Sequence, residues 1–118
     1  MYDLLPQLGR ILFGGYFVVM GMNHFLKKDM LVGYAKSKHV PMPDVAVMGS
    51  GVLLLVGGIG TLFGIYTQIA AFALLLFLIP VSLKMHAFWA ETDQMAKMGD
   101  MAHFLKNMAL LGATLMMF

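Results

Sequence analysis

The sequence contains no cysteine. This excludes disulfide bonds, thiolate metal ligands and thiol redox chemistry, so any redox role requires a bound cofactor or a partner protein. Charge is also scarce, because only 12% of the 118 residues are charged, whereas globular domains average about 25%. Hydrophobic residues make up 60% of the chain, which is more than a soluble domain of this size can bury. We therefore expect an integral membrane protein that forms a single domain over residues 1–118.

A basic patch and a cleavable leader are missing as well. The net charge is only +2, and the eight basic residues are spread among long apolar runs, which argues against binding to nucleic acid. The N-terminal stretch MYDLLPQLGR has no basic segment, and the apolar run after Arg10 does not end in a small-residue cleavage site. We expect this first apolar segment to be retained as a membrane helix.

Four apolar segments are long enough to cross a membrane, because a bilayer core of about 30 Å requires about 20 residues of helix. The predicted spans cover residues 4–25, 45–64, 65–88 and 101–118. The turn between the second and third spans is tight, near Gly64, so these two helices should form an antiparallel hairpin. The sequence thus predicts an all-α integral membrane four-helix bundle with short connecting loops.

The loop after the first span is longer than the others and has room for an interfacial helix at about residues 30–38. Pro41 and Pro43 would end this helix before the second span begins. The loop between the third and fourth spans, WAETDQMAKMGD, is polar and has room for one more helical turn.

Positive charge is concentrated on one side of the predicted spans. Seven lysines fall in the two longer loops or near span ends on the loop side, namely Lys27, Lys28, Lys36, Lys38, Lys84, Lys97 and Lys106. Only Arg10 lies toward the other side. The positive-inside rule then predicts that both loops are cytoplasmic and that both termini lie outside the cytoplasmic membrane.

Each span has one modestly polar face, and polar side chains inside a membrane require a partner or a function. His24 ends the first span, His86 lies near the end of the third, and His103 begins the fourth, all on the loop side. We therefore expect a histidine cluster at one end of the bundle. Its other members would be Asn23, Asn107, Lys84, Lys106 and Trp89.

Three interpretations of this cluster are open. Three imidazoles can bind a metal ion such as zinc or copper, although the spans supply no carboxylate and the histidines lack HxxH or HxxxH spacing, which disfavours a metal site. Alternatively, histidine, asparagine and lysine side chains hydrogen-bond the carbonyls of a quinone head group, with Trp89 and phenylalanine rings around it. The third interpretation is structural, because interfacial His, Trp and Lys side chains also anchor helix ends.

Arg10 shares a helical face with His24 and is expected to point inward. Inside the bundle its guanidinium would pair with an anionic ligand or with helix-end carbonyls, whereas an outward Arg10 would extend to lipid phosphates. The predicted ligand-binding residues are His24, His86, His103, Asn107, Asn23, Trp89, Lys106 and Arg10.

Several spaced motifs resemble one family. The stretch LGRILFGGYFVVMGMNHF resembles the first span of the DoxX family of small four-span membrane proteins. Later parts of the chain also resemble that family. They are the loop GYAKSKHVPMPD, the glycine-rich second span with its short turn VGGIGTLFGIYTQIAAFALLLF, the HAFW ending of the third span, and the entry into the fourth span QMAKMGDMAHFLKNMALLGA. The resemblance implies a link to redox processes, since relatives named DoxD are part of a thiosulfate:quinone oxidoreductase.

The second span departs from the family pattern. Family members often carry a glutamate a few residues before the double glycine, whereas this chain reads SGVLLLVGG. Whether the protein is an enzyme therefore stays open. One expected function is a redox-associated subunit that binds a quinone or similar small molecule near the histidine cluster. The other is a non-catalytic accessory or assembly subunit, or a small-molecule carrier. The expected partners are the lipid bilayer, redox proteins and, through the Gly60-x-x-x-Gly64 spacing, a second copy of the chain.

Overall fold

The computed structural model describes residues 4–118, which form five α-helices and one short 3₁₀ helix. In chain order these are α1 (Leu4–Leu26), α2 (Lys28–Ser37), α3 (Pro43–Phe63), α4 (Thr67–Lys84), the 3₁₀ helix η1 (Phe88–Ala90) and α5 (Gln94–Leu115). No strand occurs among the described residues, and the all-α class is confirmed. Helix α2 occupies the place of the interfacial helix that the sequence predicts.

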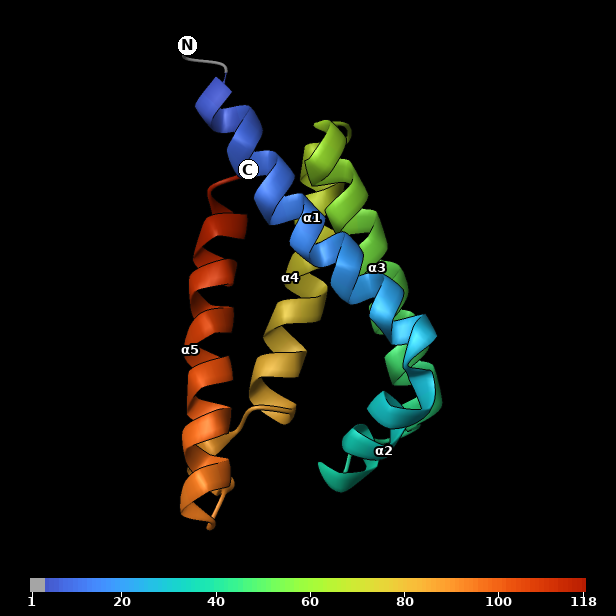
Figure 1. Ribbon diagram of the computed structural model, residues 1–118, viewed down its shortest axis with the longest axis vertical. Helices are drawn as coiled ribbons and strands as arrows, with labels where there is room; N and C mark the ends of the chain where they lie inside the picture. The colour runs from blue at the N-terminus through green and yellow to red at the C-terminus, as the bar shows by residue number, and fades with distance from the viewer. Residues whose placement is uncertain (1–3) are drawn as a thin grey trace.

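The long helices lie side by side along a molecule that measures 48 × 26 × 20 Å (Figure 1). Helix α1 packs on α3, α3 packs on α4, and α4 packs on α5, while α2 folds back against α3. The α3–α4 turn, the start of α1 and the end of α5 lie toward one end of the molecule (Figure 1). Helix α2 and the segment between α4 and α5 lie at the other end, which we call the loop end.

Local sequence sets the helix boundaries. Gly64 ends α3 with a left-handed φ of 68°, a conformation that glycine adopts at little cost, and this makes the short turn into α4 possible. At the start of α5, the Asp93 side chain accepts a hydrogen bond of 2.9 Å from the backbone N–H of Ala96. This cap starts α5 at Gln94, seven residues before the expected start of the fourth span at residue 101.

Glycines let the backbones of α1 and α3 approach closely. A Cβ atom added to Gly14 would lie 2.6 Å from the backbone nitrogen of Leu62, and one added to Gly58 would lie 2.7 Å from that of Val18. Gly60 packs in the same way against Ala70 of the neighbouring helix α4. Gly58 and Gly60 of α3 therefore serve close helix contacts within the bundle, which is how membrane helices associate in the absence of a hydrophobic driving force.

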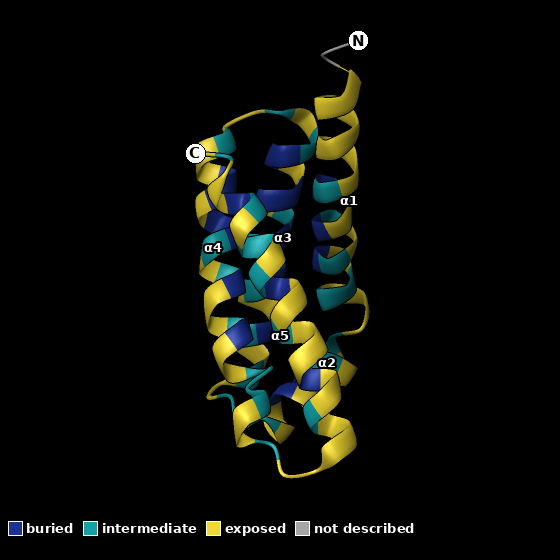
Figure 2. Cartoon of the chain, turned by 90° about the vertical axis from the view of Figure 1, so that its left-hand side faces the viewer, coloured by how far each residue is buried: buried dark blue, intermediate teal, exposed yellow. Residues whose placement is uncertain are grey.

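Buried residues line the inner faces of the helices, and exposed residues cover the outer faces (Figure 2). The core contains Phe17, Leu54, Leu74 and Leu78, all nearly inaccessible. Large apolar side chains such as Leu12, Leu26 and Phe63 are exposed, as expected of a surface that contacts lipid.

Three of the described helical segments are long and apolar enough to cross a membrane, namely Leu4–Leu26, Pro43–Phe63 and Thr67–Ala90. The fourth predicted span corresponds to α5. With 22 residues α5 has the length for a crossing, but it is more polar than the other three because it carries Lys97, Asp100 and Lys106.

Candidate functional site

A cavity of about 370 Å³ lies between α2, α3 and α4 near the loop end, and it is called here the large cavity to distinguish it from a space of about 50 Å³ described below. An apolar groove of about 460 Å³ between α3 and α4 offers no charged side chain. The polar lining residues of the large cavity are His24, Ser50 and Lys84. The rest of the lining is mostly apolar and includes Leu31, Ala35, Val40, Val47, Leu76 and Phe77. The volume lies within the range of about 300 to 1,000 Å³ that is typical of small-molecule sites.

His24 enters the large cavity with a defined tautomer. Its Nδ1 lies 2.7 Å from the carbonyl oxygen of Met20, one turn earlier in α1. Because a carbonyl oxygen only accepts, Nδ1 carries the hydrogen, and in the neutral ring Nε2 is left as an acceptor. The ring also meets Phe77 edge to face, with centroids 6.0 Å apart.

Pro80 interrupts the backbone hydrogen bonding of α4 beside the large cavity. Helix α4 continues through Pro80, but proline has no backbone N–H, so the carbonyl of Leu76 lacks its usual helical donor. Both Leu76 and Pro80 line the cavity. The proline that the sequence places in the third span therefore removes one backbone donor from the helix beside this space.

The other two predicted histidines lie together in a different place. The rings of His86 and His103 stack with centroids 4.9 Å apart. His86 also lines a second space of about 50 Å³, called here the small cavity, between α1, α4 and α5. Phe77 and Val81 line both cavities, which are therefore neighbours. The three histidines share one end of the bundle, but the structure divides them between two sites.

Lys106 and Asn107 belong to the small cavity. The Lys106 ammonium donates a hydrogen bond of 3.0 Å to the hydroxyl of Tyr16, which lies near the middle of the 23-residue α1. Lys106 therefore lies deeper than the span-end position expected from the sequence. The early start of α5 is the reason, since it places Lys106 more than three turns inside the helix.

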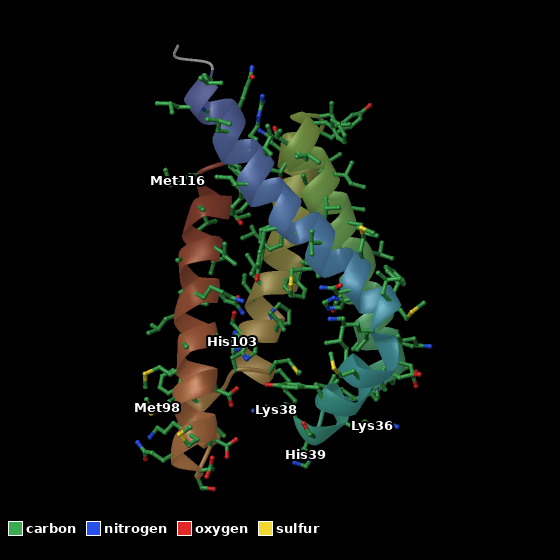
Figure 3. All side chains as sticks on the ribbon, viewed as in Figure 1. Lys36, Lys38, His39, Met98, His103 and Met116 are labelled. Atoms are coloured by element: carbon green, nitrogen blue, oxygen red, sulfur yellow. The ribbon has the colours of Figure 1, made fainter. Side chains whose placement is uncertain are left out.

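A partly buried ion pair near these histidines is not predicted from the sequence. The Lys38 ammonium donates a 2.6 Å hydrogen bond to Oδ2 of Asp100 and lies 3.8 Å from Oε2 of Glu91. Asp100 is only 4% exposed, and its Oδ1 lies 3.6 Å from Nδ1 of His86. Figure 3 shows Lys38 reaching from α2 toward α5, whereas Lys36 points away. The hydrogen bond to Asp100 raises the pKa of Lys38 above its usual range.

The sequence does hold a signal for this pair. Asp93 is a favoured N-cap residue that can mark a helix start, and extending α5 back to Gln94 places Asp100 inside the helix rather than in a loop. The partner of Asp100 could not be read in the same way, because Lys38 is 62 residues away in the chain.

The remaining predicted residues lie apart from both cavities. Trp89 is 54% exposed and packs edge to face with Phe88 and Phe104. Asn23 is half-buried on α1. Arg10 lies at the opposite end of the molecule, where its guanidinium would be 2.6 Å from a Cβ on Gly64. This places a cation beside the end of α3, where helix carbonyls favour positive charge.

Acidic and imidazole side chains do not form a metal cluster in the part of the chain that the structure describes, since no three of them come close enough to hold an ion.

Comparison with protein families matches residues 5–87 to DoxX. The matched segment contains every residue that lines the large cavity, but it ends before Lys106 and Asn107 of the small cavity. No curated protein and no solved structure matches the chain at a significant level.

Proposed function

This chain belongs to the DoxX family, and from that premise we propose that it is a redox-associated membrane subunit that binds a quinone or a similar lipid-soluble molecule. The binding site that we propose is the large cavity. The single observation that supports it best is the position of His24, a polar side chain with a free ring nitrogen at a mostly apolar cavity of about 370 Å³.

The chemistry of the lining favours the reduced form of such a molecule. Nε2 of His24 and the carbonyl of Leu76 are both acceptors, and they match the two hydroxyl donors of a hydroquinone. The oxidised form has only carbonyl acceptors and would depend on the hydroxyl of Ser50 or the ammonium of Lys84 for donors. The apolar walls suit the ring and its tail, which would enter laterally from lipid.

Replacing His24 by phenylalanine should weaken hydroquinone binding by about fivefold, because one hydrogen bond of about 1 kcal/mol is lost while an aromatic ring is kept. The measurement is calorimetric titration of the purified protein in lipid nanodiscs with a short-chain hydroquinone. His39→Asn is the control, since His39 is exposed at the same end and asparagine tolerates its positive φ of 60°. Equal affinities for wild type and His24→Phe, or no binding to wild type, would contradict the proposal.

A non-catalytic role is the second candidate. The large cavity is lined by no carboxylate, and its polar groups are few, so it suits a carrier or an accessory subunit that holds a molecule without changing it. In that role the protein would transfer its ligand to partner redox proteins, or it would act as a homo-oligomer formed with a second copy of the chain. Turnover of hydroquinone by the purified protein with an added electron acceptor, and no partner, would exclude this alternative.

We also propose that the loop end faces the cytoplasm and that the termini lie outside the cytoplasmic membrane. The concentration of lysines at the loop end supports this orientation. Because the chain has no cysteine, a single Lys36→Cys variant reports the orientation directly. In right-side-out vesicles, this cysteine should resist a membrane-impermeant maleimide until the vesicles are opened. Immediate labelling would contradict the proposal and show that the loop end faces outward.

A further inference from the structure

The small cavity between α1, α4 and α5 is a second site, and we propose that it binds a singly charged anionic group. Its polar lining consists of Tyr16, His86, Lys106 and Asn107. None of these residues lines the large cavity, so the proposal does not depend on quinone binding.

The charge of this site is positive and uncompensated. Lys106 takes part in none of the ion pairs formed within residues 4–118, and no aspartate or glutamate lines the cavity. Asp100, the nearest acid to His86, is already paired with Lys38. The ammonium lies beside Tyr16, near the middle of α1, and a charge at that depth in a membrane is costly without a counter-charge. An anion bound beside Lys106 supplies that charge.

The hydrogen-bonding groups are arranged as donors. Lys106 donates to the oxygen of Tyr16, which leaves the hydrogen of the Tyr16 hydroxyl free to donate to a ligand. Asn107 is only 5% exposed, lines the cavity, and forms no side-chain hydrogen bond within the described residues. Its amide group is therefore free to donate to a ligand in the cavity.

The volume limits what can bind. A space of about 50 Å³ is several times what one water needs, about 10 to 15 Å³, but it is too small for a quinone ring. It fits a halide ion or the carboxylate head of an amphiphile. Tyr16 and Lys106 are exposed at the outer surface, so a carboxylate can arrive from lipid as well as an ion from water.

Thermal unfolding of the full-length protein in nanodiscs of neutral lipid tests this site. Titration with bromide, against gluconate at equal ionic strength, tests for a free ion, and titration with laurate tests for a membrane-borne carboxylate. We expect a saturable rise in Tm for at least one of them, and the one that responds identifies the source. In Lys106→Met, the rise in Tm should be absent or should require at least tenfold more ligand. In Lys97→Met, which removes a lysine elsewhere on α5, the rise in Tm should be the same as in the wild type.

Asn107→Asp provides a test that does not depend on removing Lys106. The substitution keeps the shape of the side chain and places a carboxylate in the cavity beside the ammonium. We expect this variant to have a higher Tm without added anion and to lose the response to bromide and laurate. The proposal is overturned if neither anion raises the Tm of the wild type, or if Lys106→Met and Asn107→Asp respond as the wild type does.

Discussion

Gly14→Ala is expected to lower the free energy of unfolding by about 2 to 3 kcal/mol, although alanine is the better helix former. The added Cβ would lie 2.6 Å from the nitrogen of Leu62 and 2.8 Å from the carbonyl oxygen of Gly58. Both are backbone atoms of α3, so no side chain can rotate away, and the two helices must separate. The measurement is reversible unfolding in mixed micelles by titration with sodium dodecyl sulfate, followed by circular dichroism.

Gly15→Ala is the matched control, since a Cβ at this neighbouring position of α1 meets nothing within 4 Å. It should leave the stability unchanged or raise it by up to about 1 kcal/mol through helix propensity. Equal destabilisation by the two substitutions would show that the α1–α3 contact does not depend on the absence of a side chain at Gly14.

Asp100→Asn is expected to destabilise the protein by about 2 kcal/mol, because it leaves the Lys38 ammonium with a neutral partner in a partly buried place. The side chain of Asp100 is 6% exposed and that of Lys38 is 21% exposed, so solvent screens this pair less than a surface pair. The same unfolding titration measures the effect. Asp29→Asn, on the exposed surface of α2, should change stability by less than about 0.5 kcal/mol.

A double-mutant cycle with Lys38→Met separates the pair from its surroundings. If the contact accounts for the effect, the two substitutions together should cost clearly less than the sum of the single ones. Additive costs would contradict the assignment. The pair also matters for the large cavity, because Lys38 ties the end of α2 to α5 and α2 forms one wall of that cavity. Asp100→Asn should therefore weaken hydroquinone binding as well.

The pH dependence of this pair follows from the direction of the Lys38 shift. The pKa of Lys38 is raised by the hydrogen bond to Asp100, so the stabilisation is fully present below the ordinary lysine value of about 10.4. It is lost only as pH rises through the raised pKa. The difference between wild type and Asp100→Asn should accordingly stay constant from about pH 6 to pH 9 and shrink above about pH 10.4.

The sequence predicts most of the fold because membrane helices are set by local features. Long apolar runs define α1, α3 and α4, Gly64 defines the hairpin turn, and the proline-bounded segment defines α2. The start of α5 was misplaced because its first two turns are polar, and hydropathy alone assigns them to a loop. The Asp93 cap overrides hydropathy there.

The arrangement of the candidate site was harder to predict. Helical periodicity places His24, His86 and His103 at one end, but it does not show that His24 lines one cavity and His86 another. Phe77 contacts the His24 ring edge to face and lines both cavities. The Lys38–Asp100 pair depends on how α2 folds back and on the true start of α5, and neither follows from the periodicity of any one helix.

Photoreactive labelling tests the central claim most directly. A hydroquinone that carries a small diazirine is equilibrated with the protein in nanodiscs and irradiated, and the labelled peptides are mapped by mass spectrometry. The account predicts labels on the walls of the large cavity, at Leu31, Val40 or Leu76, that excess unlabelled hydroquinone removes. Labels confined to α5, or spread evenly over the outer apolar surface and insensitive to competition, would contradict it.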